Sequence, residues 1–214
     1  MFLFRRSTYV AVAALAALLG CAALGSAQSD DGLSERDRGR LARGELIVRE
    51  TSQRRGPLTL IGGTSFQVIN ASPDLVWRAL HDAARFGEML PGATRSQQTF
   101  RRGNDRGLAV QHGTGALSAS YELKLNYVEP TRVVMFQVDD QNPGALRAGW
   151  GFLKVRPWAG GDKTLVTFGI LADVGDGMLA GALRPRVHEW MLRVPQTMKR
   201  FLERHGNAIY ARGN

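Results

Sequence analysis

The stretch of sequence that decides the fold spans residues 71–95 and reads ASPDLVWRALHDAARFGEMLPGATR. It follows an apolar, strand-like run at residues 64–69. Ser72 is a good helix N-cap, Pro73 suits the first helical position, and Asp74 places negative charge in the first turn. The sequence therefore predicts that a helix begins here. The apolar face of this helix consists of Leu75, Val76, Ala79 and Leu80.

The same stretch ends in a short apolar knuckle before the chain turns into further strands. The residues of the knuckle are Phe86, Met89, Leu90 and Pro91, and Gly92 permits the turn that follows. A strand is therefore expected to lead into a pair of helices, and the LPG sequence at residues 90–92 is expected to return the chain to a strand.

The rest of the chain alternates between strand-like runs and turn residues. In residues 119–128 the side chains of Tyr121, Leu123, Leu125 and Tyr127 alternate with polar ones, which predicts a strand with one buried face. Short turns between successive strands predict an antiparallel meander. Further strands are expected at residues 45–50, 57–61, 64–69, 97–101, 107–112, 132–138, 146–156 and 164–172, with a turn at 52–56.

A long helix is predicted at residues 177–204, because apolar residues recur there at spacings of three and four. Pro185 and Pro195 are expected to bend it, since proline removes an internal hydrogen bond. A helix with so apolar a stripe must pack on another surface, and the sheet is the only large one that the pattern predicts.

This order of elements resembles the START-like superfamily of polyketide cyclases, coenzyme-Q-binding proteins and Bet v 1-like proteins. The resemblance covers residues 44–206 and rests on ASPDLVW with LPG, on GWGFLKVRPW at residues 149–158, and on the terminal helix. It implies an α+β helix-grip fold, in which a curved antiparallel sheet wraps around a long C-terminal helix. It also implies that a hydrophobic small molecule binds in an internal cavity.

Residues 1–27 are typical of an export signal, with Arg5 and Arg6 before an apolar run at 9–19 that is short for a membrane span. Residues 18–21 resemble a lipobox that would make Cys21 the acylated N-terminus, whereas small residues at 25–27 favour cleavage before Gln28. An uncleaved anchor is the third alternative. The expected location is therefore periplasmic or membrane-anchored, or else secreted. Residues 28–43 are interpreted as a polar tether with a short helix at 34–42, and residues 207–214 as a tail.

Composition narrows the possible chemistry. Cys21 is the only cysteine of the 214 residues, so the folded domain has no disulfide, cysteine nucleophile or thiolate metal site. The formal net charge is +9, which favours solubility or attraction to anionic lipid headgroups. An exported protein meets little nucleic acid, and the tandem aromatics of an RNA-binding motif are missing, so no nucleic-acid partner is expected.

The candidates for catalysis are few. The four histidines have no metal-ligand spacing, and no nucleophile elbow, P-loop or dinucleotide fingerprint occurs, so neither a metal nor a cofactor is expected. His112 alternates with apolar residues that are expected to face inward. Together with Tyr121 or Tyr127, it is the best available pair for acid/base chemistry.

The predicted cavity is lined by apolar and aromatic residues of the sheet and the long helix. These residues are Tyr121, Leu123, Leu125, Tyr127, Met135, Trp150, Phe152, Phe168, Met178, Met191, Val194 and Met198. The same residue types would also fill a solid core, so the pattern does not separate a core from a cavity. Binding or carriage of a lipid, quinone or polyketide-like compound is the preferred interpretation. The alternatives are a cyclase or dehydratase that uses the His/Tyr pair, and an interaction module with a filled core.

Overall fold

The computed structural model describes residues 32–113, 119–142, 144–175 and 189–211. The predicted signal at residues 1–27, Cys21 and Met178 lie outside the described residues. The chain divides into units at residues 1–33 and 34–214, and the second contains all the elements below. The helical elements of that unit are α1 (Glu35–Ala42), α2 (Pro73–Leu80), η1 (Ala83–Arg85), α3 (Phe86–Met89), η3 (Glu129–Thr131), α5 (Val194–Phe201), η4 (Leu202–Gly206) and α6 (Asn207–Tyr210).

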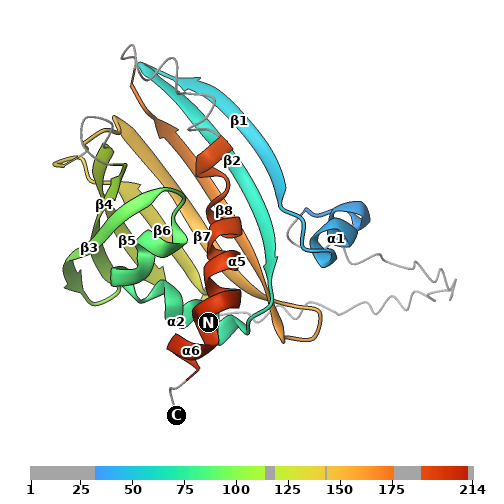
Figure 1. The fold of residues 1–214 in the computed structure, drawn as a ribbon. Coiled ribbons are helices and arrows are strands. Elements are labelled where there is room, and N and C mark those ends of the chain that lie inside the picture. Colours follow the sequence, from blue (N-terminus) through green and yellow to red (C-terminus); the bar gives the residue numbers. More distant parts are fainter. Residues whose placement is uncertain (1–31, 114–118, 143, 176–188, 212–214) are drawn as a thin grey trace, which may run out of the picture. The chain divides into compact units, whose positions relative to one another are not determined.

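Eight strands form one antiparallel sheet. They are β1 (Ile47–Arg55), β2 (Leu58–Ile69), β3 (Ala93–Arg102), β4 (Asp105–His112), β5 (Ala119–Val128), β6 (Val133–Val138), β7 (Ala148–Trp158) and β8 (Lys163–Asp173). Their spatial order is β1-β2-β8-β7-β6-β5-β4-β3. The sheet curves around α5, which lies on its concave side (Figure 1). This arrangement confirms the predicted α+β helix-grip fold.

The first two strands differ from the prediction. A turn was expected at residues 52–56, but β1 continues to Arg55, and β2 runs without a break through Gly62 and Gly63. These glycines have φ angles of 151° and 141°, a backbone conformation that L-residues with a side chain rarely adopt. A Cβ at Gly62 would lie 2.0 Å from the carbonyl oxygen of Ile170 on β8. The glycines therefore do not separate two strands, and they let one strand follow the curvature of the sheet.

Helix α1 forms within the polar stretch, where the short helix was predicted. The hydroxyl of Ser34 accepts a hydrogen bond from the Asp37 amide, and the Asp37 carboxylate accepts one from the Ser34 amide, which makes a reciprocal cap. Leu41 is fully buried, and α1 contacts β1 and β2. The helix is thus packed on the edge of the sheet.

The decisive stretch folds as its capping residues predict. Ser72 caps α2 by accepting a hydrogen bond from the Leu75 amide at 3.3 Å, and Pro73 is the first residue of the helix. The knuckle forms η1 and α3, and the turn at Gly92 has a φ of 61°. A Cβ at Gly92 would lie 2.1 Å from the Trp190 ring. Glycine is therefore required where the knuckle meets the C-terminal segment.

The predicted C-terminal helix is not one continuous helix. Its first part, residues 177–188, lies outside the described residues, and a turn at residues 192–193 interrupts the part that follows. Pro195 has no amide hydrogen, so it sits in the first turn of a new helix, α5. The chain then forms the π-helical turn η4 and stays helical to Tyr210, beyond the predicted end at Arg204. Among the described residues, no helix is long and apolar enough to cross a membrane.

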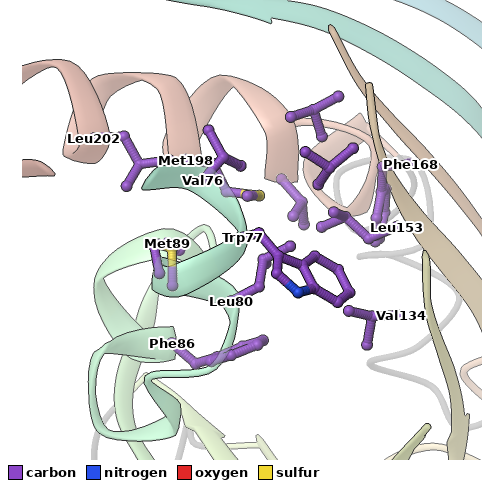
Figure 2. Close-up of a cluster of buried hydrophobic side chains, with 14 of the residues drawn as sticks. Val76, Trp77, Leu80, Phe86, Met89, Val134, Leu153, Phe168, Met198 and Leu202 are labelled. Atoms are coloured by element: carbon purple, nitrogen blue, oxygen red, sulfur yellow. The ribbon is translucent and has the colours of Figure 1, made fainter. Parts of the chain in front are cut away.

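The hydrophobic core lies between the concave face of the sheet and the helices (Figure 2). Val76, Trp77 and Leu80 of α2 face Val134 and Leu153 of the sheet in this view. Met198 and Leu202 close the cluster from the C-terminal helices, and Phe86 and Met89 close it from the knuckle. Helix α2 thus packs on β7 and β8 of the sheet.

We expect that Gly62→Ala destabilises the protein by about 2 kcal/mol or more, because the new Cβ would meet a backbone oxygen in a strained conformation. Gly39→Ala in α1 is the matched control, since its Cβ would make only an ordinary contact at 3.8 Å and alanine favours the helix. Urea denaturation followed by circular dichroism measures both changes. Equal stability of Gly62→Ala and the wild type would contradict this account of β2.

Candidate ligand-binding cavity

A cavity of about 330 Å³ lies between the concave face of the sheet and the C-terminal segment. Strands β5 to β8 form one wall with Leu123, Leu125, Val134, Phe136, Leu153, Phe168 and Ile170. Trp190, Met191, Val194 and Met198 form the opposite wall, and the knuckle closes one side with Phe86, Met89, Leu90 and Pro91. Among the described residues that line it, no lysine, arginine, aspartate or glutamate occurs. The polar side chains at these described walls are His112, Tyr121 and the indole of Trp190.

Most of the predicted lining residues lie at this cavity. They are Tyr121, Leu123, Leu125, Phe168, Met191, Val194 and Met198. Tyr127 belongs to the same face of β5, but it lies deeper, in the packed core against α2, and does not line the cavity. The cavity and the core therefore share one face of the sheet, and Leu125, Val134 and Leu153 belong to both.

Three predicted lining residues, Met135, Trp150 and Phe152, lie on the other face of the sheet. Met135 pairs with Phe152, and its side chain is 47% exposed on the convex face. Trp150 also points to this face, where the Arg55 guanidinium lies 5.9 Å from its ring centroid. Strands β6 and β7 carry apolar residues on both faces, so alternation alone did not show which set points inward. The inward set is Val134, Phe136 and Val138 on β6, with Gly149 and Leu153 on β7.

Sequence reasoning did not assign the knuckle and Trp190 to the site. Phe86, Leu90 and Pro91 were identified only as the end of the helical stretch, and Trp190 only as part of the apolar stripe. The signal that could have placed them is Gly92, because a glycine between a knuckle and a strand often marks a close approach of another chain segment. Here that segment carries the Trp190 ring.

The structure brings His112 and Tyr121 together inside the cavity. His112 is the last residue of β4, and its Nε2 lies 2.9 Å from the hydroxyl oxygen of Tyr121 on β5. Its Nδ1 lies 3.1 Å from the carbonyl oxygen of Pro91 in the knuckle. The Trp190 ring packs against the imidazole with 4.8 Å between the ring centroids. The knuckle, the sheet and the C-terminal segment thus meet at one polar point of an apolar cavity.

Burial determines the charge state of both groups. It lowers the pKa of His112 below its ordinary value, and hydrogen bonds to the backbone of Pro91 and Gly92 oppose this effect. Burial also raises the pKa of the Tyr121 hydroxyl. Both side chains are therefore neutral at neutral pH. As acid/base candidates, they can share one proton without placing a charge in the cavity.

Tyr127, the other predicted partner of His112, has a structural role. Its hydroxyl donates a hydrogen bond of 2.5 Å to the carbonyl oxygen of Leu80 at the end of α2, and burial raises its pKa to about 12. Its ring packs against His81, with 4.5 Å between the ring centroids, and the guanidinium of the buried Arg106 lies 4.5 Å from the Tyr127 ring centroid. These contacts attach α2 to the sheet outside the cavity.

The structure also contains no obvious metal site among the residues that it describes. No group of three or more histidine, cysteine, aspartate or glutamate side chains lies in an arrangement that could hold an ion there. The chemistry available at the described walls is hydrophobic contact, the N–H of the Trp190 indole and the His112–Tyr121 pair.

We expect that Tyr127→Phe lowers the free energy of unfolding by about 1–2 kcal/mol, because it leaves the buried carbonyl of Leu80 without a partner. Tyr210→Phe is the control, since its hydroxyl donates to Asp82 at a half-buried position and its loss should cost less. Urea denaturation gives both values. A Tyr127→Phe variant as stable as the wild type would show that this hydrogen bond does not hold α2.

Comparisons with known proteins agree with the fold. The sequence matches the family described as "Polyketide cyclase / dehydrase and lipid transport" over residues 63–204. A search of curated proteins found no significant match.

Solved structures share the fold at low sequence identity. A protein from Thermus thermophilus is 16% identical with a TM-score of 0.58, covering 70% of this chain and 98% of that one. The Zhui aromatase/cyclase from Streptomyces sp. R1128 is 12% identical with a TM-score of 0.56, covering 78% and 100%. A START superfamily protein from Mycobacterium smegmatis is 13% identical with a TM-score of 0.52, covering 66% and 96%. The family match spans more than half of the sequence, so the chain belongs to the polyketide cyclase/dehydrase and lipid transport family.

Proposed function

We propose that this protein binds and carries a neutral, hydrophobic small molecule in the cavity beneath its C-terminal helix. The observation that carries the proposal is an apolar cavity of about 330 Å³ with one polar pair in its wall. Pockets for drug-sized ligands span roughly 300–1,000 Å³, so this volume suits a compact ligand at the lower end of that range.

The lining determines the class of ligand. Burial of apolar surface contributes roughly 25 cal/mol per Å², so a hydrocarbon skeleton gains most of its affinity from contact with these walls. A carboxylate or phosphate would lose its hydration without gaining a cationic partner, since the described lining has no lysine or arginine. A neutral ring compound of quinone or polyketide type with few polar groups offers a large apolar surface and has no charge that would lose its hydration.

We also propose that the protein is exported and works in the periplasm or at a membrane surface. The support is the sequence of residues 1–27, with Cys21 as a candidate for acylation and Gln28 as the alternative first residue. A lipid anchor together with basic surface residues would keep the carrier close to a source of apolar ligand. Intact mass measurement of the protein from its own host would distinguish an acylated Cys21, a free Gln28 and an uncleaved chain.

A second candidate function is catalysis of a cyclisation or dehydration. The observation in its favour is the 2.9 Å contact between His112 and Tyr121 inside the cavity, which is the geometry of a general acid/base pair. If the protein is an enzyme, His112→Gln should reduce turnover of a compound in host extracts by a factor of about 100 or more while binding persists. Liquid chromatography with mass spectrometry on extracts incubated with each protein would test this. Unchanged extracts with the wild type would count against catalysis.

For the carrier function, we expect that Val134→Phe abolishes most ligand uptake, because a phenyl ring at this buried, inward position occupies the cavity. Met135→Phe is the matched control, since it adds the same ring to the same strand on the exposed face. Native mass spectrometry of gently purified protein, before and after incubation with a host lipid extract, measures the bound fraction.

The wild type and Met135→Phe should carry a discrete bound mass, and Val134→Phe should lose most of it. A wild-type protein that stays at its apo mass under both conditions would contradict the proposed function. Organic extraction of the bound fraction then identifies the compound.

A further inference from the structure

The hydrogen bonds of His112 fix which of its nitrogens carries a proton. Nδ1 lies 3.1 Å from the carbonyl oxygen of Pro91, and a carbonyl oxygen can only accept. Nδ1 must therefore carry hydrogen in both protonation states of the ring. In neutral His112 the other nitrogen, Nε2, has a lone pair and no hydrogen, so it can only accept.

This tautomer determines the direction of the next hydrogen bond. The partner of Nε2 at 2.9 Å is the hydroxyl of Tyr121, which must donate its single hydrogen to the ring. Once that hydrogen is used, the Tyr121 oxygen has only acceptor capacity left for other partners. Tyr121 and His112 both line the cavity, so a ligand bound there can be the partner of this oxygen.

Protonation of His112 reverses the direction of its hydrogen bond with Tyr121. A proton from solvent binds at Nε2, which then donates to the Tyr121 oxygen, and the tyrosine hydrogen becomes free to donate to another acceptor. The same oxygen thus presents an acceptor to the cavity when His112 is neutral and a donor when it is charged.

Charged side chains near this pair are directed elsewhere. Arg95 on β3 and Glu122 on β5 belong to the convex face, where they contact Gln97 and Thr99. Glu189, next to Trp190, pairs with Arg193. Among the described residues, the groups that face the imidazole are Pro91 and Gly92 through their backbone, the Tyr121 hydroxyl and the Trp190 ring. The proton on His112 therefore decides the polarity of this point of the cavity.

We infer that the His112–Tyr121 pair selects ligands by their hydrogen-bonding group, accepting from a phenol or alcohol when His112 is neutral and donating to a ketone or quinone carbonyl when it is protonated. This inference rests on the proposed function, because it concerns the polar end of the ligand that the cavity holds. A carbonyl ligand beside neutral His112 would face a second acceptor, or would take the tyrosine hydrogen and leave Nε2 without a partner.

Three compounds of nearly equal shape test the inference: fluorene, 9-hydroxyfluorene and 9-fluorenone. They share one tricyclic skeleton and differ in having no polar group, a hydroxyl or a carbonyl. Titration of the full chain, followed by the fluorescence of its tryptophans, gives the Kd of each at pH 8 and at a lower pH. Trp190 lines the cavity and should report binding directly.

At pH 8 the alcohol should bind about threefold to tenfold tighter than the ketone, which is the range expected for one hydrogen bond. At a lower pH, where NMR shows the His112 imidazole to be protonated, this preference should disappear or reverse. Tyr121→Phe should remove the preference at both pH values while fluorene still binds. His112→Gln, whose side-chain oxygen can accept from Tyr121 but does not titrate, should keep the alcohol preference at both pH values.

The outcomes separate this inference from the function on which it rests. Binding of all three compounds with equal affinity would overturn the inference and leave the carrier function standing. So would a wild-type preference that is the same at pH 8 and at a lower pH where NMR shows the His112 imidazole to be protonated. A preference that survives in Tyr121→Phe would also overturn it. Failure of all three compounds to bind at either pH would count against the proposed function and the inference together.

Discussion

A single helix cannot fill the concave side of an eight-stranded curved sheet, and this mismatch of shape underlies the rest of the structure. Where α2 covers the sheet, Val76 and Trp77 fill this space and pack into the core. Elsewhere, the C-terminal segment faces the strands across a space of about 330 Å³. Core and cavity are therefore consequences of the same sheet, and residues such as Leu80 and Phe86 belong to both.

The knuckle at residues 86–92 connects this architecture with the chemistry of the cavity. Because Gly92 has no side chain, the Trp190 ring packs directly on the turn, and that ring also contacts His112. The adjoining carbonyl of Pro91 accepts the Nδ1 hydrogen of His112 and so fixes its tautomer. A turn whose local role is to end a helix thus sets the direction of every hydrogen bond in the polar pair.

The sequence predicted those features that depend on local pattern. Ser72 and Pro73 identified the start of α2, and the alternation in β5 placed Tyr121, Leu123 and Leu125 on the concave face. The alternation pattern did not predict side-chain orientation where both faces of a strand are apolar. Met135, Trp150 and Phe152 are residue types common in cores, but they lie on the convex face. The strands predicted at residues 57–61 and 64–69 left Gly62 and Gly63 between them as a break. Only the neighbouring carbonyl oxygens of β8 and β1, which a Cβ would meet, show why glycine is needed within a continuous strand. The contact of His112 with Tyr121 depends on strand register, which a single sequence does not specify.

Ligand recognition and catalysis both require a neutral pair of side chains that exchanges one hydrogen in an apolar environment. The described charged side chains near the pair have partners away from the cavity. The energy of the site therefore depends on how many of its few lone pairs and hydrogens find partners. A carrier needs only a ligand that completes this small network. An enzyme needs in addition a reacting bond within reach of Tyr121 and a route by which the transferred proton returns. The described walls supply the neutral pair, and they hold no acid/base group besides His112 and Tyr121.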